Sequence, residues 1–297
     1  AARTGDARDA WEHGPHVKEE EFTRAVSLGL FDSLRKSGSR GFVVSASGGA
    51  DSSAVACLVA SAVHLAAKEL TPAGAAARLG ITLSTDDDTA LTLVGRILTC
   101  VYQSTANSGP VTRAAARGLA EAIGATFYEF DVEPMVAAYT AAVATAIGRP
   151  LDWSHDDIAL QNIQARGRSP GIWMLANVSR ALLLSTSNRS EAAVGYATMD
   201  GDTSGGIAPI AGIDKAFLRR WLVWMERSGP AGLAPIPALA AVNAQPPTAE
   251  LRPAGSGQTD EGDLMPYDVL DAIERCAIRD KQLPVEVWRR MQVHFPD

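Results

Sequence analysis

An apolar segment, a serine–glycine turn and an alanine-rich segment follow one another near the start of the chain, and this order constrains the fold most strongly. Residues 41–46 are apolar and β-branched, Ser47-Gly48-Gly49 interrupts them, and residues 51–70 resume as an alanine-rich run of helical length. We therefore predict a strand, a glycine loop and a helix in succession. Such a loop lies where parallel sheets bind ligands, at the carboxyl end of a strand.

Further apolar segments of strand length alternate with helical patterns along the chain. Strands are predicted at residues 99–104, 125–132 and 181–186, and helices at 19–34, 112–123, 158–166, 172–180, 214–226, 267–280 and 285–293. Ser169-Pro170-Gly171 is expected to separate two of these helices, and residues 187–209 and 228–257 are expected to run as long loops. The alternation predicts an α/β fold, a doubly wound parallel sheet with helices on both faces in a Rossmann-like three-layer sandwich.

The ends of the pattern indicate the domain organisation. Residues 1–18 contain Gly5, Gly14 and Pro15 without a sustained period, so we expect a leader or linker there. Residues 19–297 are expected to form one domain. The chain starts at Ala1 rather than at a methionine, as a processed or excised piece of a longer protein would.

Composition narrows the function classes. A net charge of −7 and a pI near 5.3 argue against a broad nucleic-acid-binding surface, because neutralising phosphates requires clustered Lys and Arg. We see no apolar run approaching the roughly 20 residues of a membrane helix, so we predict neither a membrane span nor a signal peptide. Cys57, Cys100 and Cys276 are far apart and odd in number, which predicts neither disulfides nor a zinc site and favours a reducing cytoplasm.

The loop Ser47-Gly48-Gly49-Ala50-Asp51-Ser52 has the composition of a phosphate-binding turn. Glycines let backbone N–H groups approach an anion, and the helix dipole and serine hydroxyls favour a phosphate there. The loop has neither the lysine of a G-x-x-x-x-G-K-[ST] loop nor the pattern G-x-G-x-x-G. Because a carboxylate beside a phosphate requires a cation between them, Asp51 is a candidate Mg²⁺ ligand. The alternative is a simple turn that caps the helix, in which Asp51 is the N-cap or a first-turn residue.

Several later motifs accompany this loop. They are N-I-Q-A-R-G-R at 162–168, S-T-S-N-R-S-E-A-A-V-G-Y at 185–196, D-G-D at 200–202, P-I at 209–210, Lys215, P-T-A-E-L-R-P at 247–253 and Q-T-D-E at 258–261. The loop resembles the pyrophosphate-binding loop of the N-type ATP pyrophosphatases, which share an adenine nucleotide alpha-hydrolase-like fold. With the later motifs, residues 19–274 resemble NAD synthetases, and in particular the synthetase portion of the glutamine-dependent, fused form.

The resemblance implies roles for particular residues. Those expected to bind ATP are Ser45, Ser47, Gly48, Gly49, Asp51, Ser52, Thr186, Lys215 and Thr248. Those expected to meet deamido-NAD or the reacting centre are Asn162, Arg166, Glu191 and Asp202. Asp51 and Glu191 are expected to hold Mg²⁺, and Asp51, Lys215 and Asp202 to act in catalysis. The implied reaction is attack of the nicotinate carboxylate on the ATP α-phosphorus, which releases pyrophosphate, followed by displacement of AMP by ammonia to give NAD.

The resemblance also implies a homodimer, with ammonia supplied by a glutaminase domain or partner. The ammonia-dependent short forms carry a lysine near Met199, an acidic residue near Gly206 and a His-Lys pair near the C-terminus, and this sequence departs from them at all three places. Three alternatives stay open: another ligase of the same loop group, a nucleotide-binding module without turnover, and an inactive fragment. The first predicts a basic surface or paired cysteines, and the second predicts loss of Asp51, Glu191 or Lys215.

Overall fold

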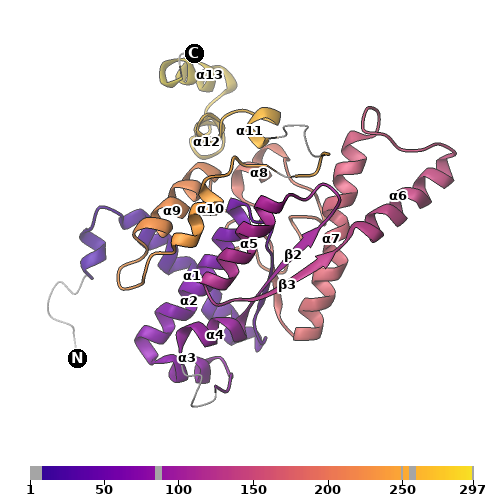
Figure 1. The fold of residues 1–297 in the computed structure, drawn as a ribbon. Helices are drawn as coiled ribbons and strands as arrows, with labels where there is room; N and C mark the ends of the chain where they lie inside the picture. Colours follow the sequence, from indigo (N-terminus) through magenta and orange to yellow (C-terminus); the bar gives the residue numbers. More distant parts are fainter. Residues whose placement is uncertain (1–8, 84–88, 249, 254–258, 296–297) are drawn as a thin grey trace.

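A parallel β-sheet forms the centre of the structure, a computed structural model that describes residues 9–83, 89–248, 250–253 and 259–295 (Figure 1). Within these residues the strands are β1 (Phe42–Ser45), β2 (Leu98–Ser104), β3 (Thr126–Asp131) and β4 (Leu182–Leu184), in the spatial order β3-β2-β1-β4. The neighbouring strands pair in parallel. Residues 1–8 of the expected leader, and Ala249 and Gln258 of the later motifs, lie outside the described residues.

Helices make up most of the described chain between and after the strands. The α-helices are α1 (Val17–Ser37), α2 (Ala50–Leu70), α3 (Pro72–Arg78), α4 (Ala90–Ile97), α5 (Pro110–Ala122), α6 (Glu133–Ile147), α7 (Asp157–Ser179), α8 (Arg189–Val194), α9 (Lys215–Arg227), α10 (Ala240–Asn243), α11 (Asp260–Asp263), α12 (Tyr267–Glu274) and α13 (Pro284–His294). Short 3-10 helices are η1 (Ala10–His13) and η3 (Pro237–Leu239), and a π-helical turn, η4 (Arg275–Arg279), continues α12.

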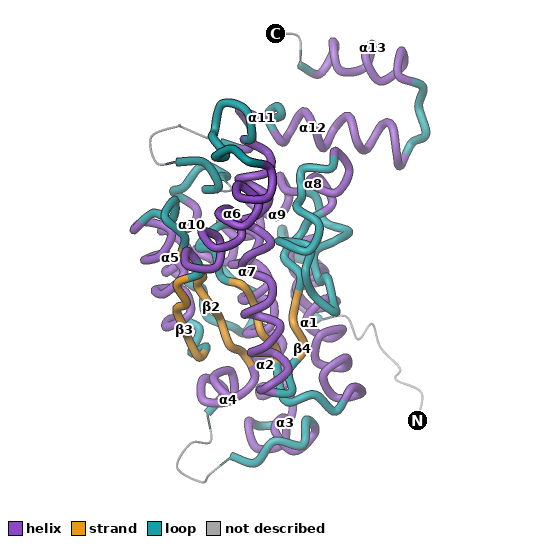
Figure 2. Tube along the Cα trace, turned by 90° about the vertical axis from the view of Figure 1, so that its right-hand side faces the viewer, coloured by secondary structure: helices purple, strands orange, loops and turns teal. Residues whose placement is uncertain are grey.

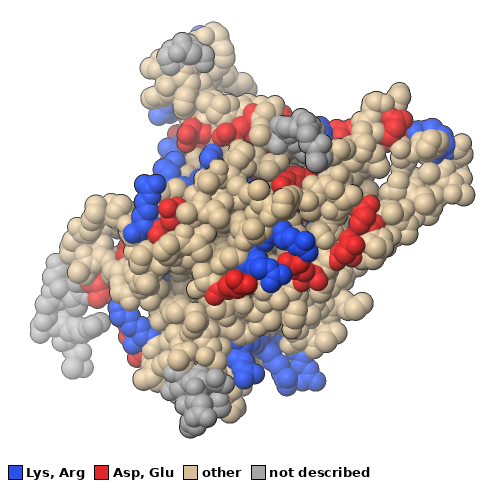
Figure 3. Space-filling view, viewed as in Figure 1, with Lys and Arg blue, Asp and Glu red and all other residues tan. Residues whose placement is uncertain are grey.

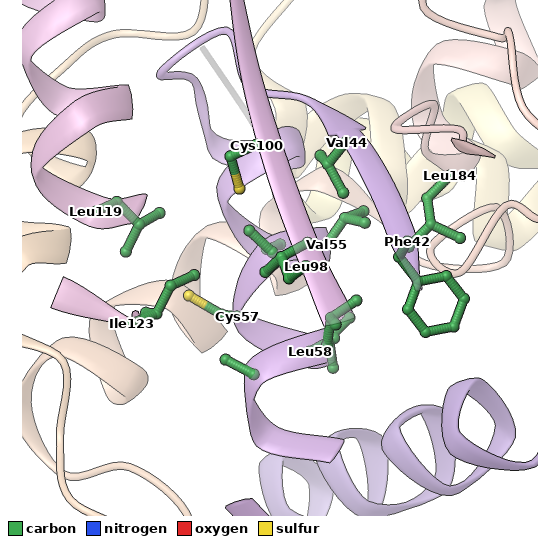
Figure 4. Close-up of a cluster of buried hydrophobic side chains, with 14 of the residues drawn as sticks. Phe42, Val44, Val55, Cys57, Leu58, Leu98, Cys100, Leu119, Ile123 and Leu184 are labelled. Carbon is green, nitrogen blue, oxygen red and sulfur yellow. The ribbon is translucent and has the colours of Figure 1, made fainter. Parts of the chain in front are cut away.

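Both faces of the sheet are covered by helices, as parallel strands require. Side chains alternate along β1: Phe42 and Val44 belong to a large core cluster with α2, α5 and α9, whereas Val43 packs with Ile172 of α7 on the other face. Figure 2 shows α7 lying along the sheet on that second face. Figure 4 shows side chains from three strands, α2 and α5 meeting in the larger cluster. The predicted three-layer α/β fold is confirmed.

Helix α2 runs through the middle of the larger cluster. By length and composition alone it could cross a membrane, which corrects the expectation that no apolar run of this length is present. In the fold, 72% of its most apolar window is buried, because residues such as Val55, Leu58 and Val59 pack into the core. A core helix of a globular protein has the same composition, so this helix is weak evidence for a membrane span.

The sequence prediction fails at several places in the second half of the chain. A single helix, α7, runs through Pro170, where the sequence predicts a break. Proline removes one backbone donor, but Ile172 and Ala176 after it pack on the sheet, and Gln103 Nε2 donates to the carbonyl of Arg168 at 2.6 Å just before it. Helix α8 occupies part of the predicted loop 187–209, and helix α6 lies in a segment for which the sequence predicts no helix or strand.

The strand order places a topological switch between β1 and β4. From β1 the chain moves outward to β2 and β3 on one side, and β4 then pairs with the other side of β1. In doubly wound sheets the loops that leave two such strands diverge at the carboxyl ends and open a crevice there. Helices α8, α11 and α12 gather at this end of the molecule, and α3 and α4 lie at the opposite end (Figure 1).

Candidate active site

A cavity of about 1040 Å³ occupies the crevice at the switch point. Its wall includes the loops after β1 and β4, one side of α7 and the first turns of α2 and α9. Of the residues that the sequence singles out, those on the wall are Ser45, Ser47, Gly49, Asp51, Ser52, Asn162, Thr186, Glu191, Asp202, Lys215 and Thr248. Folding thus brings together most of a predicted set that spans some 200 positions of the chain.

The loop from Ser47 to Ser52 is held by its own serines. Ser47 N donates to Ser52 Oγ at 3.2 Å, and Gly49 N donates to Ser47 Oγ at 3.2 Å. Gly48 has a φ of +82°, and a Cβ on it would lie 2.0 Å from the carbonyl oxygen of Thr112 in α5. Gly48 therefore lets the loop approach α5. The first N–H groups of α2 have no acceptor within the helix and remain available to an anion.

Asp51 does not act as a helix cap. The N-cap of α2 is Gly49, and no side chain caps this end. Instead, Asp51 Oδ1 accepts a hydrogen bond from Asn188 Nδ2 at 2.9 Å, and Asp51 Oδ2 accepts one from Lys215 Nζ. Asn188 Oδ1 in turn accepts from the backbone N–H of Glu191 at 3.0 Å. Asp51 is therefore a first-turn residue of α2 and not its N-cap, and its carboxylate ties the loop Ser47–Ser52 to α8 and α9.

Lys215 joins two carboxylates inside the cavity. Its Nζ pairs with Glu191 Oε1 at 3.0 Å as well as with Asp51 Oδ2. Its side chain is only 3% exposed, so it is not a solvated helix lysine. The three residues lie in the first turns of α2, α8 and α9. Three helix N-termini, each with a partial positive charge, therefore meet at this cluster.

Burial sets the electrostatics of the cluster. Burial, together with the negative charge of Asp51, raises the pKa of Glu191 to about 8 against the opposing effect of Lys215. Burial alone would lower the pKa of Lys215, but Asp51 and Glu191 outweigh it and raise that pKa well above its usual value. Burial also raises the pKa of Asp202 and of Asp260 nearby. Lys215 is therefore charged, and it is surrounded by acidic groups.

Asp51 and Glu191 are suitable oxygen donors for a divalent cation. In nucleotide sites Mg²⁺ takes one or two carboxylates and completes its shell with phosphate oxygens and water. The two carboxylates share the Lys215 ammonium, so they are close enough to face one cation. They therefore fit a cation site of that kind. Among the described residues no group of three or more His, Cys, Asp or Glu could hold a metal, so the phosphates of a ligand would have to complete the coordination shell.

Asn162 and Asp202 are held on the wall by a single residue, Thr198. Its backbone N–H donates to Asp202 Oδ1 at 2.7 Å, and its Oγ1 donates to Asn162 Oδ1 at 3.2 Å. Thr186 lies on the wall just after β4. Thr248 Oγ1 accepts a backbone N–H two residues further on at 3.3 Å, as threonines in turns do. The structure places these four predicted residues on the wall of one cavity.

Arg166 and Gly48 are the predicted residues that do not line the cavity. Arg166 is exposed, and its Nε donates to the carbonyl of Met199 at 3.0 Å. Arg168 lines the cavity instead. Two positions turn a helix by about 200°, so one of the two arginines faces away when the other faces in. The substrate contact of Arg166 stays a prediction. In the structure, Arg166 has the exposed position of an ordinary solvated helix residue.

The sequence reasoning missed other residues of the wall. Tyr267 OH donates to Asp260 Oδ2 at 3.2 Å, and Lys215 Nζ lies 5.6 Å from the Tyr267 ring centroid. Glu250 Oε2 accepts from Thr112 Oγ1 at 2.8 Å, beside the phosphate loop. Asp260 and Glu250 lie within motifs that the sequence singles out, so their carboxylates could have been found. Tyr267 has no local signal that marks it.

The fold and the cavity together define a class of protein. It is a doubly wound α/β protein with a glycine–serine loop at the switch point, where a buried lysine bridges two carboxylates from neighbouring helices. A family model described as NAD synthase matches residues 22–295. The chain belongs to this family, as the motifs predict.

Individual relatives agree with the family. The glutamine-dependent NAD(+) synthetase of Aquifex aeolicus (strain VF5) is 33% identical over 273 residues, which cover 92% of this chain and 41% of the relative. The enzyme of the same name from Homo sapiens is 33% identical over 278 residues, covering 86% and 38%. The crystal structure of a glutamine-dependent NAD(+) synthetase from Cytophaga hutchinsonii has a TM-score of 0.81 at 46% identity, covering 94% of this chain and 46% of that one. This chain thus spans about two fifths of the curated relatives.

Proposed function

We propose that this chain is the synthetase unit of an NAD synthetase, which adenylylates deamido-NAD with ATP and then converts the product to NAD with ammonia. The observation that carries the proposal is the junction of Asp51, Glu191 and Lys215 at three helix N-termini beside the phosphate loop. A triphosphate needs backbone donors and local positive charge, and this place offers both. The proposal that the product is NAD is based on the names of the relatives, which are NAD(+) synthetases.

The cavity residues divide the work of the first step. The N–H groups of the loop, with the hydroxyls of Ser45 and Ser52, hold the ATP phosphates. Lys215 offsets the negative charge that grows on the phosphates as an oxygen of the nicotinate carboxylate attacks the α-phosphorus and the bond to pyrophosphate breaks. Mg²⁺ held by Asp51 and Glu191 would supply further positive charge to the phosphates. Thr186 and Thr248 contact ATP from the wall.

In the second step ammonia replaces AMP. Ammonia attacks the carbonyl carbon of the acyl-adenylate, the bond to AMP breaks, and the amide of NAD forms without a covalent enzyme intermediate. Asn162 and Asp202 hold the dinucleotide from the fixed positions that Thr198 gives them. The buried carboxylate of Asp202, whose pKa is raised by burial, is suited to accept a proton from ammonium before the attack.

We further propose that the ammonia derives from glutamine, through a glutaminase domain or partner that lies outside this chain. Matched relatives are named for glutamine and are more than twice as long as the segment that they share with this chain. We also propose the reducing cytoplasm as the location, a proposal with which the free thiols of Cys57, Cys100 and Cys276 agree. Nucleic acid is not a proposed ligand, since the net charge is −7 and the central basic residues on the face shown in Figure 3 are flanked by acidic ones.

A homodimer is proposed from the apolar side of α6. Four side chains spaced four positions apart are 44–52% exposed on this helix: Met135, Tyr139, Val143 and Ile147. Helix α7 packs beside α6 and exposes Met174 and Val178 as well. An apolar helix stripe of this kind is suited to burial against the same stripe of a second copy in an isologous contact. Sedimentation should give a dimer that Val143→Glu converts to a monomer, and a monomeric wild-type protein would reject the proposal.

The test of the function is NAD formation from deamido-NAD, ATP and Mg²⁺, with ammonium and glutamine compared as nitrogen donors. We expect NAD, AMP and pyrophosphate with ammonium, and no glutamine-dependent activity from this chain by itself. Asp51→Ala should abolish turnover while circular dichroism and the melting curve report a folded protein. Formation of no NAD above background with ammonium would reject the catalytic proposal, and full activity of Asp51→Ala would reject the metal site.

A further inference from the structure

The wall of the cavity is acidic, although its proposed ligands are anions. Among the described residues that line it are nine carboxylates and five basic side chains. Four of the basic side chains are paired: Lys215 with Asp51 and Glu191, Arg219 with Glu261, Arg220 with Asp268, and Arg252 with Asp157 and Asp263. The fifth, Arg168, has no carboxylate within ion-pair distance among the described residues.

Arg168 is fixed in place by the sheet. Its Nε donates to the carbonyl of Gln103 at 3.1 Å, and Gln103 Nε2 donates back to the carbonyl of Arg168 at 2.6 Å. The same glutamine accepts a hydrogen bond from Ser45 Oγ at 3.2 Å, at the end of β1 before the phosphate loop. One short chain of hydrogen bonds therefore connects this guanidinium with the residues that precede the loop.

The orientation leaves one edge of the guanidinium for a ligand. Nε is used by the sheet, while the donors on Nη1 and Nη2 form a planar fork that matches two oxygens of a phosphate. Arg168 is half-buried, and burial lowers its pKa against the opposing effects of Tyr102 and Glu250. A bound anion would compensate the charge of the guanidinium. The exposed Arg166 has no such setting, as its Nε bonds a loop carbonyl outside the cavity.

We propose that Arg168 binds a phosphate group of the ligand and forms a second anion site beside the loop Ser47–Ser52. The inference rests on the proposed function, since the phosphate belongs either to ATP or to the diphosphate of deamido-NAD. Fork-like contacts of Arg to phosphate give orientation as well as affinity. Arg168 would therefore hold the ligand in register with Lys215 and the loop, and it is a binding residue rather than a participant in bond breaking.

The experiment is calorimetric titration of wild-type protein and variants with ATP, AMP, deamido-NAD and inorganic pyrophosphate. Arg168→Gln removes the charge but keeps a donor for the Gln103 carbonyl, so the fold should persist. We expect this substitution to weaken the binding of at least one of the four ligands by about tenfold or more. A loss confined to ATP and pyrophosphate assigns the phosphate to ATP, and a loss confined to deamido-NAD assigns it to the dinucleotide. Arg149→Gln is the matched control, because Arg149 is exposed, pairs with Asp156 on the surface and lies outside the cavity wall; it should bind every ligand within about twofold of wild type.

Two results would overturn the inference. The first is wild-type affinity of Arg168→Gln for all four ligands. The second applies if Arg168→Gln does not fold, and is wild-type affinity of Arg168→Lys. A lysine has no planar fork of donors, so Arg168→Lys should lose about threefold or more in affinity. Pyrophosphate separates this inference from the proposed function. Pyrophosphate binding that depends on Arg168, in a protein that makes no NAD, would retain the anion site and reject the enzyme.

Discussion

Lys215 and Glu191 form a 3.0 Å ion pair between the first turns of α9 and α8, and the same ammonium bonds Asp51 in the first turn of α2. The partners of Lys215 are 24 and 164 residues away in the chain. The lysine is therefore a tertiary link between the phosphate loop and the second half of the molecule. Its removal should affect stability as well as ligand binding.

Lys215→Met should destabilise the protein strongly. The substitution keeps the apolar stem and removes the charge, which leaves two neighbouring carboxylates without their shared partner in a buried place. Breaking a buried pair from one side commonly costs about 3–5 kcal/mol. Urea denaturation at pH 8 measures the change in the free energy of unfolding. Lys36→Met is the control, because Lys36 is 69% exposed and its pair with Asp32 lies on the surface; equal losses in both variants would contradict the buried link.

Glu191 should make the protein less stable as the pH rises from about 5 to 8. Burial and Asp51 raise its pKa in the folded state to about 8, whereas an unfolded chain has a glutamate pKa of about 4.3. The folded state holds this proton more tightly over that window, so the free energy of unfolding falls as the pH rises through it. Glu191→Gln cannot titrate, and its stability should fall less over the same range. Urea titrations from pH 5 to 8.5 compare the two profiles, and parallel profiles would contradict the shift.

Adjacent glycines in the loop should respond differently to alanine. Gly48→Ala puts a Cβ 2.0 Å from the Thr112 carbonyl oxygen at a φ of +82°, so either the loop or α5 must move. A loss of about 2 kcal/mol or more is expected, together with weakened ATP binding. Gly49 has a φ of −87°, and its new Cβ would meet only the Ser47 hydroxyl at 3.3 Å. Gly49→Ala should therefore cost about 1 kcal/mol or less. Thermal unfolding of both variants is the measurement. If Gly48→Ala loses no more stability than Gly49→Ala, the loop can shift to accept the new Cβ, which would contradict the prediction.

The sheet could be predicted from the sequence because its strands carry a local signal. Segments such as 41–46 and 99–104 are apolar, short and bounded by turns, and they became β1 and β2 within one or two residues. The break expected at Pro170 failed for a non-local reason. Contacts of Ile172 with the sheet, and a hydrogen bond from Gln103, hold α7 together around the proline. No pattern within the helix indicates either contact.

The candidate site was predictable as a set of motifs but not as a geometry. The motifs supplied Asp51, Glu191 and Lys215, while their ion pairs depend on the approach of three helix ends. The choice between Arg166 and Arg168 depends on how α7 is rotated against the sheet, which one sequence does not reveal. Gly48 was expected to serve the anion, and the structure adds that it also serves the contact with Thr112.

Cys57 and Cys100 should be unreactive in the folded protein, whereas Cys276 should react slowly. Burial raises the pKa of Cys100 to about 12 and also raises that of Cys57, so thiolate is scarce at both. A disulfide reagent at pH 8 should label neither until the core unfolds, and all three thiols should react in denaturant. Cys276 is also buried, but it lies in the π-helical turn between α12 and α13, at the edge of the molecule (Figure 2).

Local opening of this terminal segment should expose Cys276 before global unfolding, because α13 buries little besides Val287, whereas most of α2 is buried. We expect one slow phase of labelling in native buffer, which Cys276→Ser removes. Mass spectrometry of the labelled peptides identifies the thiol. If Cys57 or Cys100 is labelled as fast as Cys276, then α2 or β2 opens as readily as the chain end, and the buried core described by the structure is not the most stable part of the protein.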